Sequence, residues 1–125
     1  MNLLLDTHVF LWMLAAPERL SDKARKVLVD PRHTVFLSAV SGVEIAIKRA
    51  LGKLTAPAGL AEEATHRGLT DLPLTFRHAE VLESLPPHHA DPFDRILLAQ
   101  ALAEGLTLVT HDRKFEAYAA KILWT

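Results

Sequence analysis

Short apolar runs that alternate with helical patterns constrain the fold of this chain most strongly. Five runs have strand character, the third interrupted by a proline and the last of edge-strand type: residues 2–5, 34–37, 70–74, 106–110 and 121–124. The first run is apolar at successive positions, which is typical of a strand buried on both faces. This alternation predicts a three-layer α/β domain, with a mostly parallel central sheet flanked by helices on both faces.

Helical patterns fill the intervals between these runs, and capping residues and glycines mark their ends. The expected helices cover residues 7–14, 22–29, 57–67, 75–85 and 92–104, with a short helix at 111–115. A further helix ends at Leu51 before Gly52, and either Ser38 or Ser41 can cap its start. The chain contains no internal repeat, linker or low-complexity tract, so one domain of residues 1–125 accounts for it.

Composition narrows the class of protein. The 125 residues suffice for a core, and the absence of cysteine excludes disulfides, thiolate catalysis and cysteine-type zinc sites. The amino terminus lacks the features of a signal peptide, and no apolar run is long enough to span a membrane. We therefore expect a soluble, cytoplasmic protein.

The charge balance limits how the chain can bind nucleic acid. With a net charge of −1 it is not a protein that holds nucleic acid by general electrostatics, so such a contact needs a local patch or a bound cation. Half of the residues are hydrophobic, at the top of the usual range. Either a dense core or a partner chain that covers apolar surface explains this fraction.

Residues 91–101 form the most informative stretch. Asp91 is a good helix N-cap, Pro92 fits the first helical position, and Asp94 lies near the positive end of the helix dipole. The residues that follow are almost entirely apolar, which predicts a helix buried on most sides. A carboxylate at the start of a buried helix requires an explanation beyond capping.

Four acids fall at the functional ends of predicted elements. Asp6 follows the first strand, Glu44 lies early in the helix after the second strand, Asp94 opens the helix before the fourth strand, and Asp112 follows that strand. In open parallel sheets these ends meet in one crevice. Two like charges about 4 Å apart repel by roughly 4 kcal/mol at an effective dielectric constant of 20. A bound divalent cation relieves this repulsion, and oxygen ligands favour Mg²⁺ or Mn²⁺.

Each acid also has an ordinary structural interpretation. Asp6 can cap a helix, and Glu44 can pair with Lys48 one helical turn later. Asp94 can simply stabilise the helix dipole, and Asp112 can be a turn residue. The joint placement of the four acids beside apolar strands favours the metal site.

Six short blocks carry a resemblance to a known family. They are Leu4-Leu5-Asp6-Thr7-His8, Ser38-Ala39-Val40-Ser41, Glu44-Ile45-Ala46-Ile47-Lys48, Leu51-Gly52-Lys53-Leu54, Asp91-Pro92-Phe93-Asp94-Arg95 and Leu108-Val109-Thr110-His111-Asp112-Arg113-Lys114-Phe115. In this order they resemble the PIN-domain ribonucleases, specifically the VapC-like toxins of bacterial type II toxin–antitoxin pairs. The blocks span nearly the whole chain.

The resemblance implies a PIN-like fold and an acidic site with one or two Mg²⁺ or Mn²⁺ ions that hydrolyses RNA phosphodiester bonds. By motif, the catalytic and metal-binding roles belong to Asp6, Glu44, Asp94 and Asp112, and Thr110 resembles the accompanying hydroxyl. In this hypothesis the ions bind the scissile phosphate, acidify a water molecule and stabilise the leaving oxygen.

Other residues of these blocks receive supporting roles. Asp91 is assigned to the helix cap or to support of the metal ligands. Lys48, Arg49 and Arg95 are candidate phosphate contacts, and each is equally well explained as an ordinary surface or ion-pairing residue. Glu44 is preceded by Gly42-Val43, where relatives often carry an aromatic residue. This difference affects local packing more than it affects the role of Glu44.

The resemblance also implies partners. We expect a cognate antitoxin that blocks the crevice, often with an extended segment, a toxin homodimer, and DNA contact only through the antitoxin. The catalytic acids specify the chemistry, whereas the choice of RNA depends on surface shape and loops.

Two other functions remain open at this point. The first is a non-catalytic module of the same fold that binds RNA or protein. The second is a receiver or phosphatase-like domain that uses Asp6 as a phospho-acceptor, although such sites usually bring a second acid close in sequence, and none follows Asp6.

Histidines and aromatic residues near these motifs have simpler interpretations. His88, His89 and Asp91 can suggest a transition-metal site, but adjacent histidines in a proline-rich loop lack the spacing of a zinc site, and we expect them to be exposed. The aromatic side chains Trp12, Phe36 and Phe93 are expected in the core rather than as platforms for base stacking.

Overall fold

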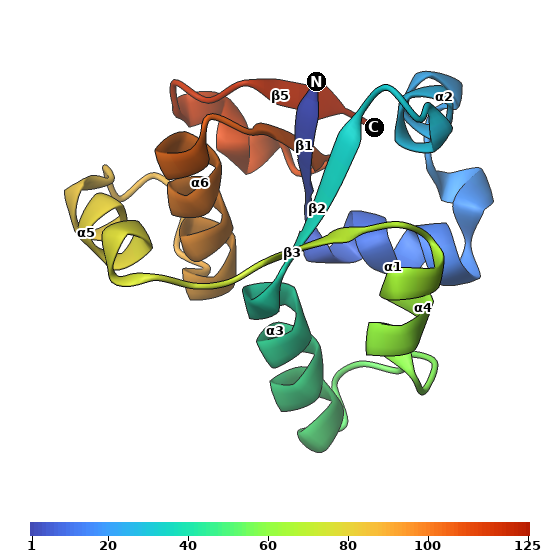
Figure 1. Cartoon of the computed structure of the whole chain (residues 1–125). Helices are drawn as coiled ribbons and strands as arrows, with labels where there is room; N and C mark the ends of the chain where they lie inside the picture. The colour runs from blue at the N-terminus through green and yellow to red at the C-terminus, as the bar shows by residue number, and fades with distance from the viewer.

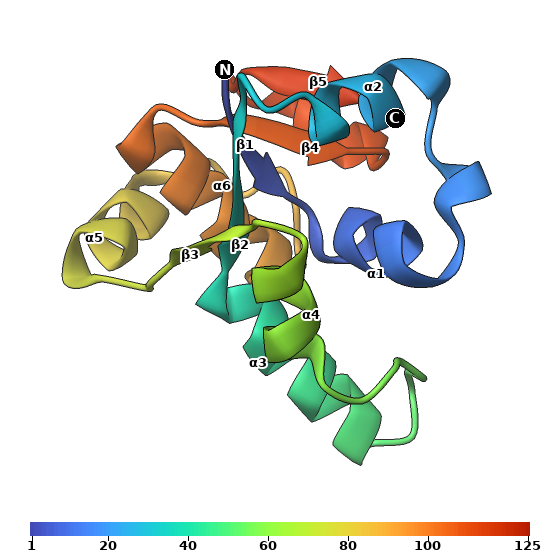
Figure 2. The same cartoon turned by 45° about the vertical axis from the view of Figure 1, so that its right-hand side comes forward.

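β1 (Asn2–Leu5) is the middle strand of a five-stranded sheet in which every pair of neighbours is parallel (Figure 1). The computed structural model describes all 125 residues and gives the strand order β3-β2-β1-β4-β5. The other strands are β2 (Thr34–Ser38), β3 (Thr70–Leu72), β4 (Thr107–Thr110) and β5 (Ile122–Trp124). The chain first builds the sheet on one side of β1 and then on the other (Figure 2). The carboxyl ends of β1 and β4 therefore flank a topological switch point, where α/β proteins place their sites.

Helices cover both faces of this sheet. They are α1 (Thr7–Ala15), α2 (Asp22–Val29), α3 (Ala39–Ala50), α4 (Leu60–His66), α5 (Phe76–Ser84) and α6 (Pro92–Glu104), with the 3₁₀ helices η1 (Pro17–Arg19) and η2 (Arg113–Ala117). In Figure 1, α5 and α6 lie on one side of the sheet, α1, α2 and α4 lie on the other, and α3 projects from the end of β2. The predicted α/β class with a flanked parallel sheet is confirmed. None of the helices is both long and apolar enough to cross a membrane.

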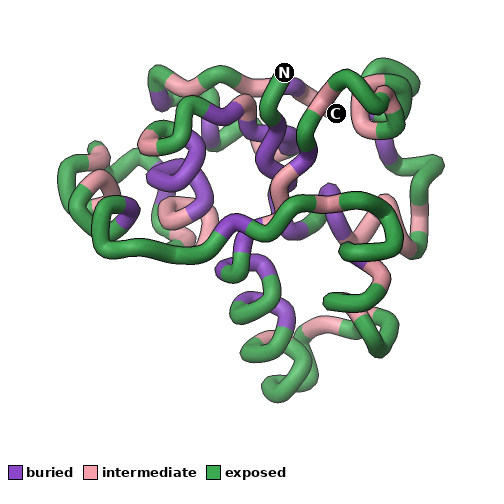
Figure 3. The backbone as a smooth tube through the Cα atoms, viewed as in Figure 1, coloured by how far each residue is buried: buried purple, intermediate pink, exposed green.

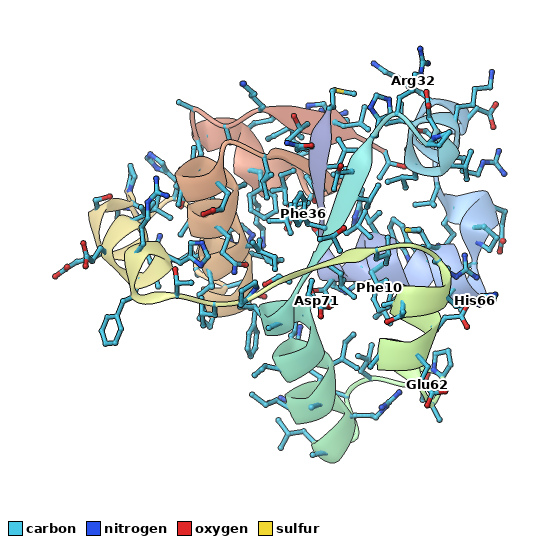
Figure 4. All side chains as sticks on the ribbon, in the orientation of Figure 1. Phe10, Arg32, Phe36, Glu62, His66 and Asp71 are labelled. Atoms are coloured by element: carbon cyan, nitrogen blue, oxygen red, sulfur yellow. The ribbon has the colours of Figure 1, made fainter.

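The alternating side chains of β1 supply both halves of the core. Leu3 and Leu5 point to one face, where they pack with Val9 and Phe10 of α1, and Leu4 points to the other, where it packs with Leu97 of α6. All three leucines are completely buried, so an unbroken apolar run is the expected pattern for this strand. Figure 3 shows buried segments in the central strands, in α3 and in α6, where five successive residues at 97–101 are buried. In Figure 4, Phe10 lies in the interior, while Arg32 and Glu62 extend from the outer surface.

Several element boundaries differ from the sequence-based prediction; for example, the short helix expected at 111–115 is the 3₁₀ helix η2 at Arg113–Ala117. The helix expected from residue 57 begins only at Leu60, because Gly59 adopts a left-handed φ of 70° that a helix interior does not allow. β3 ends at Leu72, one residue before Pro73, whose ring nitrogen has no hydrogen to donate to a neighbouring strand. Between the two candidate caps of α3, Ser38 is the one used, since its hydroxyl accepts a hydrogen bond from the Val40 N–H at 3.0 Å.

Candidate metal centre

Asp6 is fixed at the carboxyl end of β1 by hydrogen bonds to both of its carboxylate oxygens. Its Oδ1 accepts the His8 N–H at 2.9 Å, which caps α1, and its Oδ2 accepts the Thr110 hydroxyl at 2.6 Å. Burial raises the pKa of Asp6, but hydrogen bonds from His8 and Thr110 outweigh it and hold the pKa below its usual value. Asp6 is therefore a buried, ionised carboxylate.

Thr110 also reaches a second acid. At the end of β4 its hydroxyl oxygen accepts the backbone N–H of Asp112 at 3.0 Å while it donates to Asp6. Asp112 in turn caps η2, because its Oδ1 accepts the Lys114 N–H at 3.0 Å. One threonine side chain thus sets the relative position of two carboxylates that lie 106 residues apart in the sequence.

Glu44 lies on α3 and is only 2% exposed. Its Oε2 pairs with Nζ of Lys48 at 2.5 Å, whereas its Oε1 is buried and has no hydrogen-bond partner. The hydrogen bond that Lys48 donates to Glu44 raises the pKa of Lys48 despite its partial burial. An unpaired buried carboxylate oxygen is rare in folded proteins, and it marks a place where a ligand can bind.

Asp94 occupies the first turn of α6, directly after its cap. Asp91 accepts the Phe93 N–H at 2.9 Å and the Asp94 N–H at 3.4 Å, so the cap orients the turn that carries Asp94. Burial, followed by the charges of four neighbouring acids, raises the pKa of Asp94 to about 7. The four acids are Asp6, Asp91, Glu44 and Asp112. This elevated pKa is evidence that negative charge from distant parts of the sequence converges on one place.

His89 is part of this cluster, and the expectation that it is an exposed loop residue is wrong. The side chain is nearly completely buried, and its Nε2 lies 3.0 Å from Oδ2 of Asp94 and 3.2 Å from Oδ2 of Asp112. Its Nδ1 accepts the Asp91 N–H at 3.3 Å, so Nε2 carries the proton that both carboxylates share. His88, the neighbouring histidine, is exposed as predicted.

The burial of His89 depends on two side chains that clamp its loop. The hydroxyl of Tyr118 accepts the His89 N–H at 2.9 Å and donates to the Pro86 carbonyl at 2.8 Å. Arg95 Nη1 donates to the same carbonyl at 2.9 Å. Arg95 was considered as a phosphate contact, but its guanidinium is directed at this loop. The geometry therefore gives it a positioning role.

Three of the four predicted acids line one cleft. Asp6, Asp94 and Asp112 face a hollow of about 330 Å³, together with His89 and Asp91. Glu44 lies beside this cleft rather than in its wall, and its charge reaches Asp94 and His8. The potential ligand atoms of His89, Asp94 and Asp112 lie within 4.8 Å of one another. A larger hollow of about 550 Å³ between α3, α4 and β3 is mostly apolar and has no such cluster.

The donor set fits a hard divalent cation. The cleft gathers carboxylate oxygens, and one buried oxygen of Glu44 lacks a partner. Burial, followed by repulsion from the neighbouring acids, raises the pKa of Asp94. Carboxylates are the ligands preferred by Mg²⁺ and Mn²⁺. The same oxygens of Asp94 and Asp112 now accept from His89, so a cation and this imidazole compete for them.

Comparison with known proteins identifies a matching family model and a similar protein. The family model of the PIN domain matches residues 3–121. Ribonuclease VapC22 of Mycobacterium tuberculosis is 33% identical over 124 residues, which cover 94% of this chain and 92% of that protein.

Two solved structures show the same fold at low sequence identity. VapBC2 from Rickettsia felis, bound to a DNA fragment from its promoter, matches with a TM-score of 0.71 at 16% identity and covers 100% of this chain and 99% of that one. VapBC-5 from Mycobacterium tuberculosis, a member of the VapBC family of toxin–antitoxin systems, matches with a TM-score of 0.62 at 21% identity and covers 99% and 98%.

Proposed function

This chain belongs to the PIN domain family, and we propose that it is a metal-dependent endoribonuclease that serves as the toxin of a VapBC-type toxin–antitoxin pair. The observation that carries the proposal is the convergence of Asp6, Asp94 and Asp112 in one cleft, with the unpaired oxygen of Glu44 beside it. The relative of 33% identity, which is named a ribonuclease, supports the reaction class. The domain is residues 1–125, built on the single sheet.

In the proposed site, the carboxylates of Asp6, Asp94, Asp112 and Glu44 hold one or two Mg²⁺ or Mn²⁺ ions. A bound divalent cation supplies Lewis acidity to the scissile phosphate and lowers the pKa of a water molecule. Asp6 brings a carboxylate that is ionised at neutral pH, because its hydrogen bonds hold its pKa below the usual value.

The remaining residues position these acids. Thr110 holds Asp6 and Asp112 together, and Asp91 orients the turn of Asp94. Lys48 neutralises one oxygen of Glu44 and leaves the other free. His89 donates to Asp94 and Asp112 and so keeps them close together. Arg95 supports the site through the loop that carries His89.

The proposal includes partners. A cognate antitoxin covers the cleft, the toxin forms a homodimer, and contact with DNA occurs only through the antitoxin. The support is the likeness to VapBC assemblies, one of them bound to promoter DNA. Exposed apolar side chains of α3 and of the residue that caps its end, namely Val43, Ile47 and Leu51, are consistent with a surface that a partner covers.

Cleavage of single-stranded RNA with Mg²⁺ or Mn²⁺ tests the proposal. We expect the wild type to cut, and Asp6→Asn and Asp94→Asn to lose at least about a hundredfold in rate, because changes to the partners of metal ligands alone cost about 10- to 100-fold. Asp71→Asn is a matched control, since Asp71 is an exposed acid of β3 outside the cleft.

Several outcomes would contradict the proposal. Undiminished cleavage by folded Asp6→Asn and Asp94→Asn contradicts the assignment of the active site. Full activity in excess chelator contradicts metal dependence. Tight RNA binding by the wild type without cleavage favours the non-catalytic binding module.

A further inference from the structure

The wall of the acidic cleft contains an aromatic and basic cluster that the metal site does not use. We call it the Trp12 wall, which consists of His8, Trp12, Arg19, His111 and Lys114. The sequence predicts Trp12 in the core, and its side chain does pack against the core cluster, but it is only partly buried and also lines the cleft. The core side of α1 is already filled by Val9 and Phe10, which are 0% and 1% exposed.

Helical spacing explains why Trp12 faces the cleft. His8 and Trp12 are four residues apart on α1, so they lie on the same face of the helix, one turn apart. The N–H of His8 is held by Asp6, the cap of this helix, which fixes the face toward the carboxylates. Trp12 therefore lies one helical turn from the carboxylates that are proposed to bind metal.

The indole of Trp12 already has planar partners. The His111 ring lies 4.4 Å from it between centroids, and the guanidinium carbon of Arg19 lies 4.9 Å from the indole centroid. Both partners are exposed side chains, which can move aside at little cost. A nucleobase is a larger planar group with the same ability to stack on an indole.

Charge distinguishes this wall from the rest of the cleft. The carboxylates repel a phosphate backbone, while Arg19 and Lys114 offer positive charge on the Trp12 wall. An aromatic ring beside basic side chains is the arrangement with which proteins bind single-stranded nucleic acid. A hydrophobic protein segment gains less here, because only two of the residues that line the cleft are hydrophobic.

We propose that Trp12 stacks a nucleobase of single-stranded RNA next to the phosphate at the acidic cluster, with Arg19 and Lys114 contacting neighbouring phosphates. This inference rests on the proposed ribonuclease function for the reaction and adds a binding site for a base. Trp12 is a substrate-binding residue, so it sets affinity and base preference rather than the chemical step.

Tryptophan fluorescence tests the contact without altering Trp12. The chain has two tryptophans, and Trp124 lies on β5 outside the cleft, so Trp124→Phe leaves Trp12 as the only one. We would titrate this variant with oligoadenylate and oligouridylate RNA in Mg²⁺ by stopped flow, before cleavage proceeds. The control is an abasic ribose-phosphate oligomer of equal length and charge. We expect saturable quenching by the RNA and none by the abasic oligomer.

Kinetics with paired variants tests the energetic role. Trp12→Leu removes the ring, Trp12→Phe keeps a smaller one, and Trp124→Leu is the matched control. In Trp12→Leu we expect KM for RNA to rise about fivefold to a hundredfold, the range for loss of one stacked base, with kcat within about threefold. Trp12→Phe should recover most of this loss, and Trp124→Leu should leave KM unchanged.

The outcomes separate this inference from the proposed function. If the Trp124→Phe variant binds and cleaves RNA without quenching, or if folded Trp12→Leu keeps the wild-type KM, the stacking site is wrong and the ribonuclease stands. Quenching by RNA without cleavage supports the stacking site and contradicts the ribonuclease function. If the RNA causes no quenching and is not cleaved, both proposals are wrong. If Trp12→Leu does not fold, the fluorescence titration decides.

Discussion

Thr110 shows how much of the site depends on one hydroxyl group. It donates to Asp6 at 2.6 Å and accepts from the N–H of Asp112 at 3.0 Å, with no exposed surface of its own. In the sequence, only the family resemblance singles out this threonine at the end of a strand. Its importance follows from the parallel pairing of β1 with β4, which sets Leu5 opposite Val109 and brings the two strand ends together.

Thr110→Val tests this link, because it keeps the β-branched shape and removes the hydroxyl. We expect RNA cleavage to fall about 10- to 100-fold, as for other groups that orient metal ligands. The free energy of unfolding should fall by about 1–3 kcal/mol, the cost of leaving buried polar groups unpaired. Cleavage assays and urea unfolding measure the two effects. Thr110→Ser should restore both, and a fully active Thr110→Val variant contradicts the role.

At the scale of elements, the start of α6 separates two acids that are equivalent by composition. Asp91 is outside the helix and accepts backbone N–H groups, whereas Asp94 is inside the first turn and faces the other acids. Asp91 therefore stabilises the helix, whereas Asp94 destabilises the metal-free fold through burial of its charge and repulsion by the neighbouring acids. The two effects on stability have opposite signs because Asp91 makes hydrogen bonds to the helix, whereas Asp94 is a buried charge beside other negative charges.

Substitution at these two positions should have opposite effects on stability. We expect Asp91→Ala to lower the free energy of unfolding by about 1 kcal/mol, the usual cost of losing an N-cap, and Asp91→Ser to recover it. Asp94→Asn should unfold at the same or a higher temperature without metal. Calorimetry measures the difference, and the reversed order of the two melting temperatures contradicts this division of roles.

The loop at residues 85–89 is an element that the sequence did not assign to the site. Its prolines and adjacent histidines are typical of an exposed connection. Tyr118 and Arg95, which clamp it, come from later parts of the chain, and their hydrogen bonds to Pro86 pull His89 inward. The sequence around His89 gives no sign that this side chain is buried. The cause is distant, since the hydrogen bond from Tyr118 to Pro86 joins residues 32 positions apart.

At the scale of the whole molecule, the charge in the cleft couples stability to pH and metal. The pKa of Asp94 is raised from 3.8 to about 7, so the folded state binds this proton more tightly than the unfolded state does. Its contribution to stability is fully present below pH 3.8 and is lost as the pH rises to about 7. His8 acts in the same direction, because its hydrogen bond to the Asp6 carboxylate raises its pKa above 6.5.

The metal-free protein should therefore lose stability between about pH 4 and pH 7, and part of this loss should be absent in Asp94→Asn. Mg²⁺ should raise the melting temperature more at pH 7.5 than at pH 5.5, because protons compete with the cation for Asp94. Differential scanning calorimetry across pH, with and without chelator, measures both effects. Equal pH dependence in the wild type and in Asp94→Asn contradicts the assignment of the proton to Asp94.

The sequence by itself determined the succession of strands and helices along the chain, the N-cap of α6 and the position of the four acids at the ends of elements. These features depend on local chemistry: apolar runs, hydrogen-bonding caps and the period of each element. The blocks that carry the family resemblance are also short, continuous segments, so they are visible in the sequence alone. The roles of Asp6, Glu44, Asp94 and Asp112 remain predictions for the proposed assays.

Only the tertiary structure decided which side chains meet. It buried His89 between two carboxylates, directed Arg95 at a loop and placed Trp12 in the wall of the cleft. It also left Glu44 beside the cleft with one oxygen unpaired. The physical reason is that the contacts of His89 with Asp112 and of Trp12 with His111 join positions far apart in the sequence. The parallel pairing of β1 with β4 brings these positions together, so no local pattern encodes the contacts.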